Sequence, residues 1–196
     1  LIYHWSIDIA AIFYFLAGLM FLYSFLRESF SKKTVIISLS FLVLSTNLFY
    51  YGIIETGMTH IYSFSLFSAL ILLFNKWDRI CSRTNTKVFG LLVGFIFALI
   101  VLIRPTNIIF IIVILFLNKD YLLRIRKMLS PQFFGPFLII AILVFLPQLI
   151  YWNYASGSFV SYSYANETFA NWSSPRFIDV LFAPNNGQII YNPVMI

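Results

Sequence analysis

The sequence predicts an all-α protein, a multi-pass bundle of transmembrane helices. Hydrophobic residues make up 61% of the 196 residues and charged residues only 10%, whereas soluble domains carry about 25% charged residues. The mean hydropathy is +0.89. Several uncharged runs approach the ~20 residues that a helix needs to cross a bilayer. These observations disfavour a soluble enzyme and a nucleic-acid-binding domain, although the net charge is +6.

Four uncharged runs predict membrane helices, namely Ile9–Leu26, Thr34–Ile54, Ile61–Asn75 and Phe133–Trp152. The third run can be extended by Thr56–His60. The fourth contains Pro136 and Pro147, which a membrane helix tolerates when neighbouring groups satisfy the freed carbonyls. Asp8, at the start of the first run, is interpreted as a solvated helix start.

A further apolar stretch is interrupted by polar residues. Val88–Ile103 and Ile108–Leu117 are each short for a full crossing, and Arg104-Pro105-Thr106-Asn107 lies between them. Pro105 ends the first half because it disfavours helical geometry at the preceding residue and has no N–H. Two interpretations stay open: two short crossing helices, or one re-entrant hairpin. The total is about five to six membrane segments.

Basic residues are concentrated in three loops, 27–33, 76–87 and 119–127, which hold eleven of the thirteen Lys and Arg residues. Alternating spans place these loops on one side of the membrane, which leaves only Arg104 and Arg176 on the other. The positive-inside rule then predicts that the three loops are cytoplasmic. Residues 1–152 form the predicted transmembrane region, and residues 153–196 an extracytoplasmic loop that leads into a further, truncated membrane helix. Because residue 1 is leucine, we expect an internal fragment of a longer protein.

Arg104 is the first candidate binding residue, because an ionisable residue at membrane depth is a functional hypothesis by default. Its planar guanidinium suits phosphate oxygens. We therefore predict contact with the phosphate of a lipid-linked donor. The alternative is an arginine that reaches lipid headgroups or pairs with a structural carboxylate.

Three further candidates lie on the same predicted side. Glu55 and His60 share a short outer loop, in which Gly52 and Gly57 predict a break in the helix. A carboxylate there can bind a metal ion, orient a sugar hydroxyl or act as a base. The alternative is a solvated acid beside an interfacial histidine. Glu167 lies among aromatic residues, a composition found on sugar-binding surfaces.

Six motifs follow one another along the chain: Thr46-Asn47-Leu48-Phe49-Tyr50-Tyr51 with Glu55, Met58-Thr59-His60-Ile61-Tyr62-Ser63-Phe64, Arg104-Pro105-Thr106-Asn107, Pro147-Gln148-Leu149-Ile150-Tyr151-Trp152, Gly157-Ser158 and Leu181-Phe182-Ala183-Pro184-Asn185-Asn186-Gly187. Together and in this order, they resemble bacterial membrane glycosyltransferases of the GT-C superfamily that are related to dolichyl-phosphate-mannose protein mannosyltransferases, in a form associated with Bacteroidetes. The similarity covers most of the chain.

The resemblance implies a GT-C-like enzyme of the bacterial inner membrane. Such an enzyme moves a sugar from a polyprenyl-phosphate-linked donor to a saccharide, lipid or protein acceptor on the extracytoplasmic face, often with a divalent metal. Family members place an essential acidic residue in the first outer loop. This chain has no counterpart, so no catalytic residue and no metal ligand is assigned. The predicted substrate-binding residues are Arg104, Glu55, His60, Glu167 and Asn107.

Two other functions stay open at this point. A transporter or flippase for lipid-linked saccharides also uses short, interrupted helices and an intramembrane arginine. A non-catalytic subunit of a membrane assembly is the third hypothesis.

Overall fold

The computed structural model describes residues 2–77, 80, 85–116, 121–161, 174–184 and 189, and every regular element within them is a helix. The long helices are α1 (Ile2–Leu26), α2 (Lys32–Ser45), α3 (His60–Asn75), α5 (Thr86–Ile103) and α8 (Pro131–Ser156). The short ones are the π-helix η1 (Tyr50–Ile54), the 3₁₀-helix η2 (Pro105–Ile109), α6 (Phe110–Phe116), α7 (Tyr121–Met128) and α9 (Phe177–Phe182). The predicted all-α, multi-pass architecture is confirmed.

Three of these helices are long and apolar enough to cross a membrane: His4–Leu26 within α1, α5 and α8. The helix α3 and the stretch Pro105–Ile114 are apolar but shorter. Large apolar side chains cover the outside of the bundle, and only 6% of the most apolar stretch of α8 is buried. Exposed apolar surface of this extent marks contact with lipid rather than water. The chain is a multi-pass membrane protein.

The predicted second span, Thr34–Ile54, is not one helix. The helix α2 ends at Ser45, and Thr46 has extended backbone angles of φ −124° and ψ 168°. The Ser45 hydroxyl donates to the carbonyl of Phe41, and the Thr46 hydroxyl donates to that of Leu42 at 2.7 Å. Hydroxyls that bond to carbonyls four residues back compete with the helical pattern. Such bonds slightly destabilise a helix, and α2 ends at this point although the run stays uncharged.

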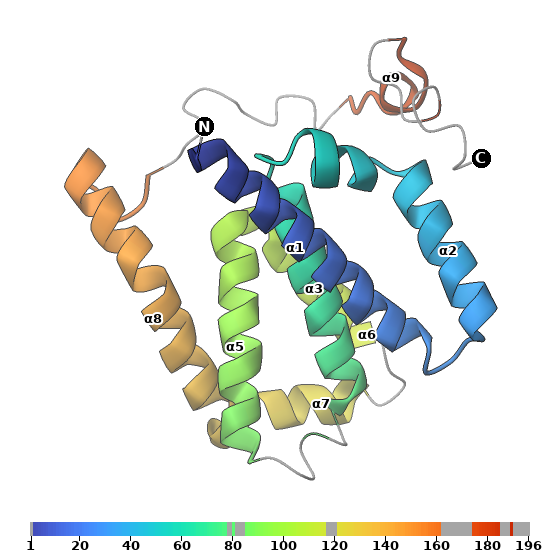
Figure 1. Cartoon of the computed structure of the whole chain (residues 1–196). Helices are drawn as coiled ribbons and strands as arrows, with labels where there is room; N and C mark the ends of the chain where they lie inside the picture. The colour runs from blue at the N-terminus through green and yellow to red at the C-terminus, as the bar shows by residue number, and fades with distance from the viewer. Residues whose placement is uncertain are drawn as a thin grey trace.

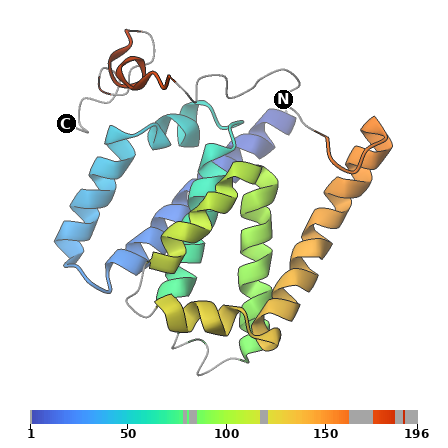
Figure 2. The same ribbon diagram turned by 180° about the vertical axis from the view of Figure 1, so that it is seen from behind.

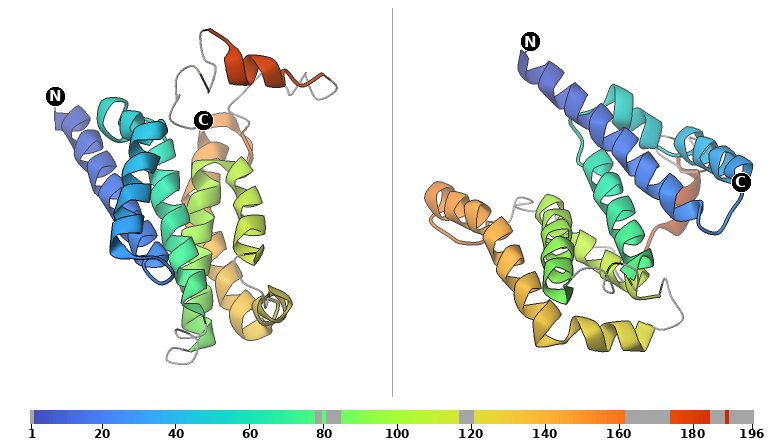
Figure 3. Two further views of the ribbon diagram at one scale, coloured as in Figure 1. Left: turned by 90° about the vertical axis from the view of Figure 1, so that its right-hand side faces the viewer. Right: turned by 60° about the horizontal axis from the view of Figure 1, so that its bottom comes forward.

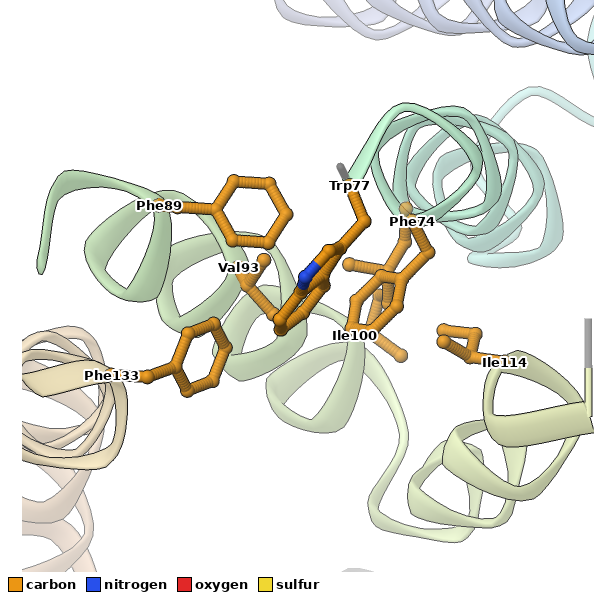
Figure 4. Close-up of a cluster of buried hydrophobic side chains, with 8 residues drawn as sticks. Phe74, Trp77, Phe89, Val93, Ile100, Ile114 and Phe133 are labelled. Carbon is orange, nitrogen blue, oxygen red and sulfur yellow. The ribbon is translucent and has the colours of Figure 1, made fainter. Parts of the chain in front are cut away.

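The bundle consists of two helix pairs that meet at its centre. The helix α1 packs on α3, α5 packs on α8, and α3 contacts α5 between the two pairs (Figure 1). A small core of Ala11, Phe15 and Ile61 lies between α1 and α3. The larger core joins α3, α5, α6 and α8, and its aromatic centre is drawn in Figure 4. Its buried members are Leu70, Phe74, Trp77, Phe89, Val93, Ile100, Ile114 and Phe133.

Glycines allow α5 and α8 to approach closely. A Cβ atom on Gly90 would lie 2.5 Å from the carbonyl oxygen of Phe133, and one on Gly94 would lie 2.7 Å from that of Phe137. Two glycines four residues apart form the small-residue pattern that lets membrane helices pack backbone to backbone. The two helices contact each other here and diverge toward the other end of the bundle (Figures 1 and 2).

The described parts of the three basic loops gather at one end of the bundle, at the bottom of Figure 1. Glu28 links two of the loops, because its carboxylate accepts a hydrogen bond from Asn75 at 2.6 Å and lies 4.0 Å from Lys76 Nζ. The third loop joins them where Arg124 donates to the carbonyl of Phe74 at 2.8 Å. These contacts place the described parts of the three loops at one end of the bundle, while the side of the membrane on which that end lies stays a prediction. The remaining residues of 76–87 and 119–127 lie outside the described part.

The interrupted stretch folds into a helical hairpin at the opposite end. The helix α5 ends at Ile103, Arg104 is extended with φ −149° and ψ 120°, and Pro105 begins η2. The chain then returns along α6 (Figure 2). The predicted end of the first half before Pro105 is confirmed. By contrast, α8 runs unbroken through Pro136 and Pro147 and ends at Ser156, where it is capped by Gly157, whose φ of 70° is left-handed.

Candidate functional site

The end of the bundle opposite the basic loops brings three predicted residues together. Arg104 and Asn107 lie at the turn of the α5–α6 hairpin, and His60 is the first residue of α3, ahead of the apolar run that follows it. Burial lowers the pKa of His60, and the positive charge of Arg104 lowers it further. His60 is therefore neutral near pH 7, so its imidazole can both donate and accept a hydrogen bond.

Arg104 is half-buried, and its guanidinium forms no hydrogen bond or ion pair with the residues that the structure describes. The described ion pairs elsewhere engage Lys76 and Arg176. A partly desolvated cation without a local acceptor binds an anionic ligand well, because no internal ion pair has to be broken first. The alternative interpretation was that Arg104 pairs with a structural carboxylate. No carboxylate in the described part of the chain pairs with it.

Asn107 stabilises the turn that carries Arg104 through hydrogen bonds. Its side-chain amide donates to the hydroxyl of Ser63 at 3.2 Å and to the carbonyl of Ile100 at 3.1 Å. Its backbone N–H donates to the carbonyl of Arg104 at 2.9 Å. The first bond joins the hairpin to α3, and the other two close the turn on itself. Asn107 therefore positions Arg104 relative to His60.

Glu55 lies on the exposed side of the same end. The break predicted between Glu55 and His60 is confirmed, because residues 55–59 separate η1 from α3. The Glu55 carboxylate accepts a hydrogen bond from the Tyr50 hydroxyl at 2.7 Å. The Tyr51 ring stacks on His60 with the ring centres 4.4 Å apart, and it meets the Tyr50 ring edge-on at 5.5 Å. Two neighbouring tyrosines thus connect Glu55 with His60.

Asp8 is exposed, as a solvated residue would be, but the expectation that it starts a helix is wrong. The helix α1 begins at Ile2, so Asp8 lies within it. Its carboxylate accepts a hydrogen bond from the buried Thr56 hydroxyl at 2.5 Å. This bond holds the loop 55–59 against α1. The two residues are 48 positions apart, so no local pattern in the sequence could reveal the pair.

Sequence reasoning also missed Ser63 and Tyr51 as neighbours of the predicted residues. Both residues lie inside motifs that support the family resemblance. Their place in these motifs was the indication in the sequence that they belong near the site. Glu167 lies outside the described residues. Within the described part of the chain, no group of three or more His, Cys, Asp or Glu side chains is arranged to hold a metal ion.

Comparison with known proteins supports a family assignment. The model of the family described as dolichyl-phosphate-mannose-protein mannosyltransferase matches residues 3–152, which is most of the chain. Neither the curated proteins nor the solved structures gave a match. The matched range includes both helix pairs and four of the five predicted binding residues. The chain therefore belongs to the dolichyl-phosphate-mannose-protein mannosyltransferase family, whose members are membrane glycosyltransferases that use polyprenyl-phosphate-linked sugar donors.

Proposed function

We propose that this chain binds the phosphate of a polyprenyl-phosphate-linked sugar through Arg104 and takes part in transfer of that sugar to an acceptor on the extracytoplasmic face. The observation that carries the proposal is the half-buried guanidinium at the hairpin turn, which has no acceptor among the described residues. A polyprenyl phosphate keeps its tail in the lipid and its anionic head at the interface. A guanidinium at the end of a lipid-exposed helical hairpin suits such a head group.

The neighbouring residues suit the sugar part of the donor. His60 is neutral near pH 7 and offers both a donor and an acceptor. The Glu55 carboxylate, on the exposed side, accepts hydrogen bonds from sugar hydroxyls. The stacked Tyr51 supports the His60 ring from one face. We assign binding and orienting roles to these residues, and no residue of this chain is assigned as the catalytic base.

The described residues do not by themselves form a site of three protein ligands for a divalent metal. Three or more acidic, His or Cys ligands do not come together in the part that the structure describes. The proposal therefore contains no step that runs through a metal ion.

The proposed orientation places the basic end in the cytoplasm of a bacterial cell and the Arg104 end outside the inner membrane. The excess of Lys and Arg in loops 27–33, 76–87 and 119–127 supports it, since such residues are retained on the cytoplasmic side. On this orientation, residues 153–196, from the last turn of α8 onward, lie on the extracytoplasmic side.

The proposal is tested with Arg104→Gln, Arg104→Lys and, as a matched control, Arg176→Gln. Arg176 is also predicted to lie outside, but it pairs with Asp179 at 3.9 Å on the exposed α9. The assay measures transfer from polyprenyl-phosphate-linked mannose by the protein in reconstituted vesicles. Loss of a charge-assisted hydrogen bond weakens binding by about 10- to 100-fold. Arg104→Gln should therefore raise the KM for the donor by this factor, and Arg104→Lys should raise it less.

An unchanged donor KM in Arg104→Gln, or an equal effect of Arg176→Gln, would refute the role of Arg104. The same vesicles separate the enzyme from the transporter hypothesis. The enzyme releases the label from the lipid into a covalent product, whereas a flippase moves intact labelled lipid between leaflets. Movement without a covalent product would overturn the proposal in favour of transport.

A further inference from the structure

The short helix α7 buries its charge and exposes its leucines. Arg124 is only 6% exposed, while Leu122 and Leu123 are 67% and 62% exposed. In water this pattern would be unfavourable twice over, because it desolvates a cation and hydrates two apolar side chains. The pattern is favourable where the outer face of the helix meets lipid. The pattern therefore indicates that the outer face of α7 contacts lipid rather than water.

Arg124 sets the rotation of α7 about its own axis. Its guanidinium donates to the carbonyl of Phe74 at 2.8 Å, in the last turn of α3, where helix carbonyls lack partners within the helix. Met128, one turn later on the same face, packs against the large core. Residues on the opposite face must consequently point away from the bundle, and these are Leu122 and Leu123.

The position of α7 in the fold matches this exposure. The helix runs crosswise to α3, α5 and α8 at the basic end, and it is seen from the side in Figures 1 and 2 and nearly end-on in the left view of Figure 3. It directly precedes the membrane helix α8, with only Leu129 and Ser130 between them. For a helix that runs crosswise at the start of a membrane helix, we expect a position at the level where the hydrocarbon of the bilayer meets its headgroups.

Two basic residues accompany the exposed leucines. Arg126 and Lys127 lie in the last turn of α7 and are exposed. Residues four apart are neighbours on a helix surface. Leu122 therefore lies beside Arg126, and Leu123 lies beside Lys127. Apolar residues interleaved with basic ones are the composition of helices that lie in the interface of an anionic membrane.

The charges around α7 favour an anionic partner. The three basic loops hold eleven basic residues and three acidic ones, Glu28, Asp78 and Asp120. Of these acids, Glu28 is the one that the structure describes, and it is engaged with Asn75 and Lys76. Among the described residues, no carboxylate pairs with Arg126 or Lys127.

We propose that α7 is an interfacial helix that inserts Leu122 and Leu123 among the acyl chains at the basic end and binds anionic phospholipid headgroups through Arg126 and Lys127. The burial of Arg124 and the exposure of the two leucines carry this inference, and the charge balance identifies the lipid as anionic. The surface lies at the end of the bundle opposite Arg104, so the proposal stands independently of the glycosyltransferase function.

The test places a fluorophore on the full chain in bilayers. The single cysteine is first replaced by serine, and Leu123→Cys is then labelled with nitrobenzoxadiazole. The bilayers contain phosphatidylcholine with a nitroxide-labelled acyl chain on either phosphatidylcholine or phosphatidylglycerol. Each basic residue near an anionic surface favours association by about fivefold. Quenching by the phosphatidylglycerol probe should therefore exceed that by the phosphatidylcholine probe about two- to fivefold at equal mole fraction.

Two matched controls and one test variant accompany this measurement. Ser31→Cys carries the same label in an exposed loop at the same end and should be quenched by aqueous iodide rather than by the nitroxide. The double variant Arg126→Gln/Lys127→Gln should remove the preference for phosphatidylglycerol. Lys32→Gln/Lys33→Gln removes the same charge from the neighbouring loop and should leave that preference unchanged.

Three outcomes would overturn the proposal. Quenching of the position 123 label by iodide alone would place α7 in water. Equal quenching by the two lipid probes in the wild-type chain would show lipid contact without headgroup recognition. Protection from both iodide and nitroxide would show that a protein partner covers the helix instead of lipid.

Discussion

The side-chain amide of Asn107 donates a hydrogen bond to the hydroxyl of Ser63 at 3.2 Å and so fastens the hairpin turn to α3. Arg104 lies three residues before Asn107 in that turn, and His60 lies one helical turn before Ser63. This polar contact and the stacking of Phe67 on Phe110 join the element that carries the cation to the helix that carries the imidazole.

Asn107→Ala should loosen the turn. The substitution removes the bonds to Ser63 and Ile100, and each neutral hydrogen bond contributes about 1 kcal/mol. The free energy of unfolding should fall by about 1–2 kcal/mol, measured by thermal unfolding in bilayers, and the KM for the donor should rise. Thr106→Ala, at an exposed neighbour in the same turn, is the control. Equal stability of the two variants would contradict the fastening role of Asn107.

Gly90→Ala should separate α5 from α8. The added Cβ would lie 2.5 Å from the carbonyl oxygen of Phe133, which belongs to the backbone and cannot rotate away. Overpacking of this kind destabilises by about 1–3 kcal/mol. Gly135→Ala on α8 is the matched control, because its Cβ meets no atom within 4 Å and alanine favours a helix by about 1 kcal/mol. Denaturant unfolding in detergent measures both, and a loss of stability in Gly135→Ala equal to that in Gly90→Ala would contradict the prediction.

The imidazole of His60 should titrate below its ordinary pKa of 6.5, because burial and then the charge of Arg104 both lower that pKa. Between the lowered pKa and 6.5, the folded chain binds fewer protons at His60 than the unfolded chain. Acidification through this range therefore destabilises the fold, and stability returns above it.

Arg104→Gln removes the smaller of the two causes, so it should raise the pKa of His60 only in part. Nitrogen NMR of labelled histidine in nanodiscs follows both titrations. A pKa of His60 above 6.5 in the wild-type chain, or a further decrease in the variant, would be inconsistent with this environment.

Labelling of single cysteines should find the two ends of the bundle on opposite sides of the membrane. In a background without the native cysteine, Ser158→Cys, just after α8, should react with an impermeant thiol reagent in intact cells whose outer membrane is permeabilised. Ser31→Cys, between α1 and α2, should react only after the inner membrane is opened. The reverse pattern would overturn the proposed orientation.

Much of the fold could be predicted because the bilayer imposes simple rules on the sequence. The apolar runs of α1 and α8 have the length that a crossing requires, and Pro105 ends a helix through its own ring and its missing N–H. The run Val88–Ile103 was expected to be short for a crossing, but α5 begins earlier, at Thr86, and is long enough. The common side of the basic loops follows from the alternation of spans. The prediction of the second span was wrong, since α2 ends at the hydroxyl–carbonyl bonds of Ser45 and Thr46, within a run whose composition stays apolar.

The candidate site could be predicted only as a set of residue types. The sequence by itself determined that Arg104, Glu55, His60 and Asn107 stand in breaks between apolar runs, because charged and polar groups are costly within them. The tertiary structure decided which of them meet. Asn107 with Ser63, Asp8 with Thr56 and Arg124 with Phe74 are pairs 44, 48 and 50 residues apart. Such pairs depend on how each helix is rotated against its neighbour, and packing across the bundle sets that rotation.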